Sequence, residues 1–316
     1  MLTISDNEIQ KFLGSTTNFK ESDLHDAIGI VLKRYVIPYL SEAQLNVSVA
    51  SSSNIHIVLM DTVKRAVVNL AYAKDFMNFV LTKEISGLKD KTVKEAKASK
   101  EDKEKVQEQH WNEGFTSIDE MLAILEENQN TFTQWASSDS YTLIKSSFVS
   151  STKIFNDFVD IGMSRRTFYR LRANIRTVEQ IILPIAVDIN LLTALKSDYQ
   201  NSTLTPLKKE IITYIQALIT NYAIADALIK GSIIKNKYNT FSVYDDTQLA
   251  KTEGHKTADL ALLEKAQKEY ENTAKQYQKQ LNILINANLV ALGITPAVKR
   301  EGLKPVNKVT DGYCIM

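Results

Sequence analysis

The sequence predicts a mainly α-helical protein with two tandem repeated helical units, each with a small β-hairpin, plus a long C-terminal helix and an extended C-terminal tail. Ten glycines and five prolines in 316 residues fall below the usual usage of about 7% and 5%, which disfavours a turn-rich β fold. Apolar residues recur at spacings of three and four, as on the buried face of a helix. The pattern of residues 164–230 also occurs, in weaker form, near the N-terminus.

The repeat is anchored by two prolines that stand 146 residues apart, Pro38 and Pro184. In each copy an amphipathic helix runs into the proline, which should bend or stop it, and a short second helix follows. The next helix matches at an offset of 152, where Asn69 corresponds to Asn221. Further pairs at the first offset are Ala27 with Ala173, Ile37 with Leu183, Glu42 with Asp188 and Leu45 with Leu191. These matches indicate a duplicated helical unit.

The first unit is expected to span residues 1–128. Its expected elements are a short helix ended by Gly14, a helix over 20–40, a loop over 47–54, a helix over 56–83 and a helical face over 115–125. Residues 84–106 mix lysines and acids with almost no large apolar side chain. That composition favours a solvated loop leading into an exposed helix over a binding arm.

A linker over 129–139, with Trp135 as its packing anchor, is expected to lead into the second unit over 140–293. After the matching helices, residues 232–245 alternate apolar and polar side chains, which predicts a two-stranded hairpin. Residues 85–93 occupy the equivalent place in the first unit. Because a lone hairpin is marginally stable in water, each hairpin is a candidate interface.

The longest helix is expected over 257–292, ended by Gly293. A seam of residues at coiled-coil spacing runs along it: Leu260, Leu263, Tyr270, Ala274, Tyr277, Leu281, Leu284 and Asn288. Such a seam packs against another helix along its length, either in the same chain or in a second subunit. Residues 294–316 contain prolines, glycines and lysines and are expected to form the extended tail.

Composition and motifs argue against an enzyme, a cofactor or a metal site. The net charge of +1 gives no global reason to expect nucleic acid or an anionic membrane as a partner. The histidines His25, His56, His110 and His255 share no metal-ligand spacing, and the glycines occur singly. Cys314 is the single cysteine, so the chain forms no internal disulfide.

The N-terminus carries no basic segment followed by an apolar stretch. No apolar run approaches the length of about 18 residues that marks a candidate membrane-spanning helix. We therefore expect a protein that is made and kept in the cytosol, or assembled there into something larger.

One local concentration of charge remains, in Arg165, Arg166, Arg170, Arg172 and Arg176. On a helix several of these side chains share a side, which gives a basic stripe. Two interpretations stay open. The stripe contacts phosphates of DNA, or its arginines form salt bridges with acidic helix faces and with a neighbouring subunit.

The segment that carries this stripe has a wider resemblance. Its sequence is FNDFVDIGMSRRTFYRLRANIRTVEQIILPIAVD, and a helix with NYAIADALI, a hairpin and a long helix are expected to follow. This arrangement resembles the neck proteins of Bacteroidota-infecting tailed phages, especially the ring proteins of crAss-like phages that form the head-to-tail connector. The resemblance covers most of the chain from about residue 5 to 292, and the helical unit also resembles the small head–tail adaptors of other tailed phages.

The resemblance implies a structural virion protein that forms a homo-oligomeric ring, expected to be a dodecamer, in the phage neck. The expected partners are the portal protein, other neck and tail ring proteins, and genome DNA passing through the lumen, with no membrane. Assembly is expected in the cytoplasm of the bacterial host.

An alternative function is that of a DNA-binding or packaging accessory phage protein that uses the Arg165 to Arg176 stripe. The tail supplies a second set of candidate contacts, through its spaced apolar residues Leu303, Val306, Val309, Tyr313 and Ile315. Short extended segments of this kind dock on a sheet edge or groove of a partner. We expect the tail to dock on an adjacent subunit or on the portal.

Overall fold

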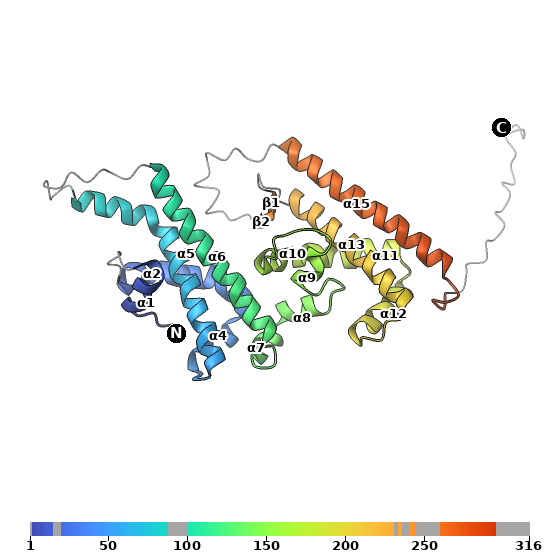
Figure 1. Ribbon diagram of the computed structural model, residues 1–316, viewed down its shortest axis with the longest axis horizontal. Coiled ribbons are helices and arrows are strands. Elements are labelled where there is room, and N and C mark those ends of the chain that lie inside the picture. Colours follow the sequence, from blue (N-terminus) through green and yellow to red (C-terminus); the bar gives the residue numbers. More distant parts are fainter. Residues whose placement is uncertain are drawn as a thin grey trace, which may run out of the picture.

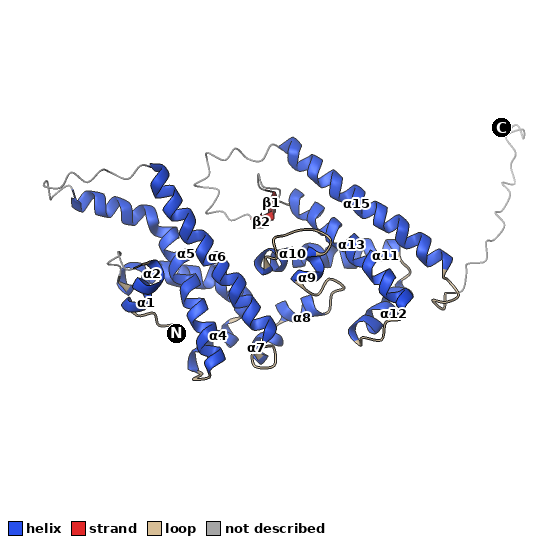
Figure 2. Ribbon diagram, in the orientation of Figure 1, coloured by secondary structure: helices blue, strands red, loops and turns tan. Residues whose placement is uncertain are grey.

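The computed structural model describes residues 2–14, 20–87, 100–230, 233–235, 241–243 and 260–294. Within these residues the protein is mainly helical, which confirms the fold class at that level (Figure 2). The molecule is elongated, with the N-terminal half of the chain at one end and the C-terminal half at the other (Figure 1). The buried apolar side chains of the two halves form one contiguous core.

The first half begins with two helices that pack on a long one. The elements are α1 (Asp6–Leu13), α2 (Glu21–Val31), the π-helical turn η1 (Leu32–Val36), α3 (Ile37–Leu40), α4 (Glu42–Ala50), α5 (Asn54–Gly87) and α6 (Lys100–Glu127). Ser5 and Glu8 form a capping box at the start of α1. At its end Gly14 adopts a φ of 91°, a conformation that favours glycine, so this helix ends as the sequence predicts.

Pro38 and Pro184 each lie two residues after the end of a widened helical turn. Proline donates no backbone hydrogen bond and its ring clashes with the carbonyl of the preceding turn. The chain avoids that clash with π-helical turns, in which Ile37 N–H bonds to Leu32 O and Leu183 N–H bonds to Val178 O, five residues back. The helix therefore continues past each proline and ends two residues later, at Leu40 and at Ala186.

The expected loop over 47–54 is wrong for most of its length. Residues 47–50 belong to α4, and only residues 51–53 link α4 to α5. The small residues of this segment are helical because Ser48 faces the core. Its hydroxyl accepts a hydrogen bond from Gln44 Nε2 at 3.0 Å and lies 3.0 Å from His56 Nδ1.

Helices α5 and α6 form a long antiparallel pair that buries polar side chains at matched levels (Figure 1). Gln107 Nε2 donates to Ala73 O at 2.6 Å, and His110 Nδ1 lies 2.7 Å from Asn69 Oδ1. Because Asn69 Nδ2 donates to the carbonyl of Arg65, its Oδ1 is the acceptor and the His110 ring is the donor. These bonds fix the register of the pair.

The pair also depends on a glycine at its closest approach. A Cβ on Gly114 would lie 2.5 Å from Leu70 Cγ and 3.3 Å from Ala66 O.

Residues 85–87, expected in the first hairpin, are instead the last turn of α5. The rest of that expected hairpin lies outside the described residues.

The link between the halves contains α7 (Thr133–Ala136) and α8 (Asp139–Lys145). Trp135 is 1% exposed, which confirms it as the packing anchor. Its backbone N–H donates to Gln44 Oε1 at 3.2 Å and its indole N–H donates to Tyr39 O at 2.9 Å. The linker is therefore held against the first half.

The second half of the chain is mainly helical, with two short strands. The elements are α9 (Thr152–Asn156), α10 (Arg165–Thr177), η2 (Val178–Ile182), α11 (Leu183–Ala186), α12 (Ile189–Gln200), α13 (Pro206–Ile229), β1 (Ile233–Lys235), β2 (Phe241–Val243) and α15 (Leu260–Ala287). The two strands pair antiparallel, with Ile233 opposite Val243. The residues between them lie outside the described part of the chain.

Helix α15 packs along α13 within the same chain, so the intramolecular alternative holds for its seam (Figure 1). Ala274 and Leu281 of this seam are fully buried. Gly293 adopts a φ of 71° after the last turns, as expected for a helix stop. Helix α13 is long and apolar enough to cross a membrane, and 78% of its most apolar window is buried inside the protein. Its apolar character therefore reflects its place in the core.

Candidate functional site

The predicted arginine stripe lies where the two halves of the chain meet. Arg165, at the start of α10, places its Nε 2.7 Å from Glu126 Oε2 of α6. Both side chains are about one quarter exposed, at 28% and 24%, so water screens the pair only in part. Burial raises the pKa of Glu126, and the hydrogen bond and charge of Arg165 oppose that shift. Arg165 therefore forms a salt bridge with an acidic helix face, as one of the two interpretations expects.

Asp119 of α6 meets the N-terminus of α10. Its Oδ1 accepts a hydrogen bond from the backbone N–H of Arg166 at 2.6 Å, and its Oδ2 accepts one from the Ser164 hydroxyl at 3.1 Å. Ser164 is itself the N-cap, since its Oγ accepts from Thr167 N–H at 3.2 Å. The first backbone N–H groups of a helix lack intrahelical partners and favour a negative charge. A carboxylate from the first half therefore caps the central helix of the second.

The electrostatic balance at Asp119 has two opposing parts. Burial raises the pKa of this carboxyl group, while the hydrogen bonds from Arg166 N–H and Ser164 and the nearby guanidinium charges oppose that rise. The Arg166 guanidinium lies over the ring of Phe115 at 3.8 Å from its centroid. Such a contact contributes about 0.5–2 kcal/mol, more when it is shielded from water.

Aromatic rings fill the junction beside these charges. Tyr39, from α3, meets Tyr169 of α10 edge to face at 6.1 Å between centroids. Trp135 and Tyr141 of the link lie 4.1 Å apart. Tyr169 is 2% exposed, and burial raises its pKa, so the phenol is neutral. The Tyr169 hydroxyl and Arg172 Nη1 are buried atoms without a hydrogen-bond partner in the structure.

The five arginines consequently do not form one continuous surface. Arg165 and Arg166 contact α6, and Arg172 is half-buried. Arg170 and Arg176 are exposed. The predicted stripe is thus divided between an internal contact and open surface, because α6 packs against the start of α10.

The second set of predicted contacts cannot be compared with the fold in the same way. Residues Leu303, Val306, Val309, Tyr313 and Ile315 lie outside the described part of the chain.

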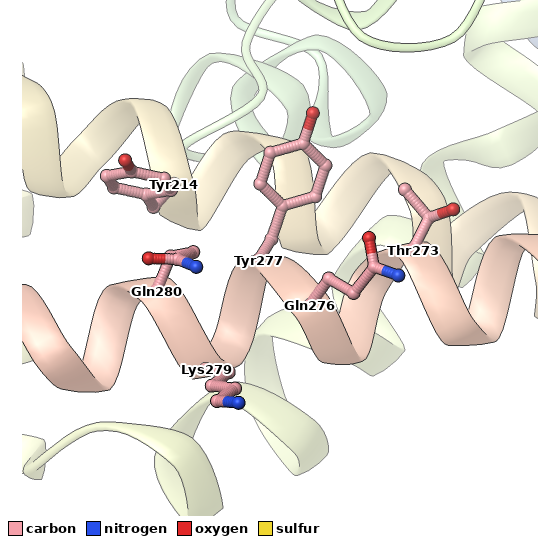
Figure 3. Close-up of a pocket in the computed structure, with 6 residues that line it drawn as sticks. All are labelled: Tyr214, Thr273, Gln276, Tyr277, Lys279 and Gln280. Atoms are coloured by element: carbon pink, nitrogen blue, oxygen red, sulfur yellow. The ribbon is translucent and has the colours of Figure 1, made fainter.

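Two further features of the described residues bear on binding and chemistry. Within residues 2–14, 20–87, 100–230 and 260–294, no group of three or more His, Cys, Asp or Glu side chains is placed to hold a metal ion. An open hollow runs along α15 beside α13 (Figure 3). It is lined by Tyr214, Thr273, Gln276, Tyr277, Lys279 and Gln280. These side chains include neither a carboxylate nor an imidazole for acid–base chemistry.

Sequence reasoning missed the partners of the arginines. Asp119 and Glu126 lie on α6 among other charged residues, 45 and 39 residues before the groups that they contact. A local signal existed only for Ser164, because serine directly before an amphipathic helix indicates an N-cap. The partner across the junction had no such signal.

Comparison with known proteins finds a family match for only part of the chain. A family of unknown function, DUF6712, matches residues 9–143. The match covers most of the first half, the linker and most of α8, and it is less than half of the chain. No curated protein and no solved structure matches the chain.

Proposed function

We propose that this chain is a structural virion protein that forms a ring in the head-to-tail connector of a tailed bacteriophage. In this role it links the portal to the tail and lines the path of DNA exit. The proposal rests on two sections of similar element order, η1–α3–α4–α5 and η2–α11–α12–α13, which we take as copies of one unit. It also rests on the sequence resemblance to neck ring proteins, carried by residues 155–188 and the segment after them.

The repeated unit is itself part of the proposal. The turns η1 and η2 both have five residues, and both precede a four-residue helix with proline at its second position. They are separated by the same offset as Pro38 and Pro184. The pairs α5/α6 and α13/α15 follow in the same order. We take β1 and β2 as the arms of a small hairpin in the second unit, while residues 85–87 of the first unit are helical.

Two buried positions within the long helix pairs support the same correspondence. Asn69 and Asn221 both donate from Nδ2 to the carbonyl four residues earlier, at 2.9 Å and 2.7 Å. When α6 and α15 are aligned from their last residues, Glu127 and Ala287, Gly114 corresponds to Ala274, which is fully buried. Small residues thus occupy the same position on each second helix, where large side chains would hold the helices apart.

A chain of two such units suits ring formation. Units that contact their successor through one surface and their predecessor through another form rings when the rotation closes. The junction between α6 and α10 already joins one unit to the next within the chain.

The alternative, a DNA-binding accessory protein, has weaker support. Arg165 and Arg166 are engaged with α6, which leaves Arg170 and Arg176 as the exposed part of the stripe. A surface that DNA slides past should hold phosphates weakly and lose them as salt rises. DNA binding that is specific and survives physiological salt would favour the alternative.

Electron microscopy of the purified full-length protein, alone and mixed with the portal protein, tests the proposal. We expect closed rings with a central opening, and we expect them to stack on the portal. Single copies in both samples at micromolar concentration would contradict the proposal.

A further inference from the structure

Two arginines of α10 stand on the surface of the second half without a carboxylate partner. Arg170 and Arg176 are exposed, and neither forms an ion pair within the described part of the chain. They flank Ala173, which is exposed as well. Six residues of an α-helix rise about 9 Å, so the two positive charges leave α10 at well-separated levels on either side of a small residue.

Helix α6 carries charges of the opposite sign. Between residues 106 and 127 it contains six carboxylates and neither lysine nor arginine. Two of these carboxylates, Asp119 and Glu126, meet the start of α10 in the same chain. Two others, Glu108 and Glu113, are exposed and form no ion pair with a described residue. The earlier turns of α6 therefore present unpaired negative charge.

Glu108 and Glu113 border a shallow hollow on the surface of α6. The hollow is lined by Lys105, Glu108, Gln109, Asn112, Glu113 and Thr116, and we call these six residues the acidic hollow. Its two carboxylates outweigh its one lysine. Because the side chains of Asn112 and Thr116 are short, a second helix can approach α6 closely here. Five residues of helix rise about 7.5 Å, which is close to the rise between the two exposed arginines.

The contact between α6 and α10 within the chain is a precedent for this pairing. Arg165 Nε lies 2.7 Å from Glu126 Oε2, and the Arg166 guanidinium lies over the ring of Phe115. The last turns of α6 thus already bind the first turn of α10 through carboxylate and arginine. The unpaired charges lie on the same two helices, outside this contact.

The separation of charge extends over both halves of the chain. Residues 1–128 contain 20 acidic and 15 basic side chains, a net charge of −5, and residues 140–293 contain 14 acidic and 19 basic ones, a net charge of +5. The two halves lie at opposite ends of the elongated molecule (Figure 1). Unlike halves of two copies therefore attract each other, although the whole chain has a net charge of +1.

We propose that Arg170 and Arg176 of one copy bind the acidic hollow of a second copy. The inference rests on the proposed function and names a contact between neighbouring subunits of the ring. Because the two surfaces are different and belong to opposite halves of the chain, the contact is head to tail, and a series of such contacts closes into a ring when the rotation allows it.

A second copy suits the two arginines better than DNA does. Asp119 and Glu126 stand at the start of α10, so a phosphate backbone laid along this helix would meet negative charge there. The acidic hollow brings carboxylates to the arginines without that extended backbone. Exposed ion pairs contribute little affinity each, and they act mainly on the orientation of the partners and on the rate at which they meet.

Charge reversal with rescue tests the contact. One variant carries Arg170→Glu with Arg176→Glu, and the other carries Glu108→Lys with Glu113→Lys. Sedimentation velocity is measured at physiological ionic strength, where exposed charges more than about 8 Å apart are largely screened. We expect each variant to associate about tenfold more weakly than wild type, and we expect an equimolar mixture of the two to regain the wild-type affinity, because opposite charges then face each other.

The control has the same change of net charge at another place. Lys265→Glu with Lys279→Glu alters two exposed residues of α15, and this variant should associate as wild type does. Circular dichroism checks that every variant is folded. The inference is overturned if wild type is monomeric at every concentration, if the control weakens as much as the arginine variant, or if the mixture associates no better than its components. Loss of DNA retention in the arginine variant with unchanged self-association would assign these arginines to phosphates instead.

Cross-linking between two different chains tests the proposed pairing of surfaces independently. In a Cys314→Ser background, one protein carries Asn112→Cys and the other carries Ala173→Cys. Oxidation of the mixture should join position 112 of one chain to position 173 of the other. A mixture of Asn112→Cys with Lys279→Cys is the control. Equal yields in both mixtures, or bridges only between two copies of position 173, would contradict the arrangement.

The two proposals fail differently in these experiments. Rings that persist in the charge-reversed variants would leave the connector function standing and reject the contact. Assemblies that depend on the arginines and on the acidic hollow, but never close and never bind the portal, would keep the contact and reject the connector function.

Discussion

The carboxylate of Asp119 accepts the backbone N–H of Arg166 at 2.6 Å, so a side chain of the first half caps a helix of the second. Asp119→Ala removes this cap and leaves helix N–H groups without a partner at a partly buried site. We expect a loss of about 1–2 kcal/mol in the free energy of unfolding. Urea denaturation measures it. Asp119→Asn, which keeps an acceptor oxygen, should lose less, and an unchanged alanine variant would show that the cap contributes nothing.

Removal of the Tyr169 hydroxyl, in contrast to removal of the Asp119 carboxylate, should not lower the free energy of unfolding. This buried oxygen has no hydrogen-bond partner among the described residues, so Tyr169→Phe removes a group whose desolvation is not compensated. We expect the variant to be as stable as wild type or more stable by up to about 1 kcal/mol. Trp135→Phe is the contrast, because its indole N–H is bonded to Tyr39 O. That change should destabilise the protein by about 1–3 kcal/mol. Thermal unfolding of both variants is the measurement. A Tyr169→Phe variant that unfolds at a lower temperature than Trp135→Phe would contradict the prediction.

Two helical glycines should respond oppositely to alanine. Gly29 in α2 has no heavy atom within 4 Å of an added Cβ, so Gly29→Ala should stabilise the protein by about 0.5–1 kcal/mol. A Cβ added to Gly114 would lie 2.5 Å from Leu70 Cγ, so Gly114→Ala should force α5 and α6 apart and cost about 1–3 kcal/mol. Chemical denaturation of the two variants gives both signs. A stabilising Gly114→Ala would show that the helices separate without penalty.

His110 should make the first half sensitive to mild acid. Burial lowers the pKa of His110 below 6.5, so the unfolded chain binds a proton at pH values where the folded chain does not. The contribution of the neutral His110 ring to the free energy of unfolding is therefore fully present above pH 6.5. It is lost as the pH falls toward and through the pKa of His110 in the folded protein. His110→Gln should flatten this dependence between pH 7.5 and 5.5. The measurement is the urea midpoint at each pH.

The control for this experiment is His25, whose pKa is raised by its hydrogen bond to Glu21. A raised histidine pKa favours the folded state below 6.5, and this contribution is lost as the pH rises through the folded pKa. His25→Gln should therefore steepen the acid loss that His110 causes. The same pH profile in both variants would disprove the assignment.

The features that sequence reasoning predicted correctly have local causes. Gly14 and Gly293 end helices because their own backbones adopt positive φ. Trp135 is recognisable as an anchor because a tryptophan in a short polar link needs a place to pack. The expected loop at residues 47–50 failed because a buried Ser48 looks like a loop residue until its partner His56 is known.

The sequence does not predict which arginines of the stripe contact α6 and which are exposed, because these contacts join residues that are distant in the chain. Arg165 and Arg176 belong to the same short helix, yet only Arg165 faces α6. Periodicity assigns residues to the faces of one helix, but it does not say which neighbour covers each face. The division of the stripe follows from the packing of α6 against α10. No local sequence pattern predicts that packing.

The widened turn before Pro184 also changes which of the following side chains face the core. One additional residue in a helical turn shifts the later side chains by about 100° around the axis. Leu171, Ile175 and Val178 face the core before the turn, and Leu183 and Val187 do so after it, one position later than an uninterrupted α-helix would place them. An uninterrupted α-helix through the same residues would place Ile182 and Ile185 toward the interior and turn Leu183 outward. The proline and its turn thus decide which isoleucines the protein offers to its surroundings.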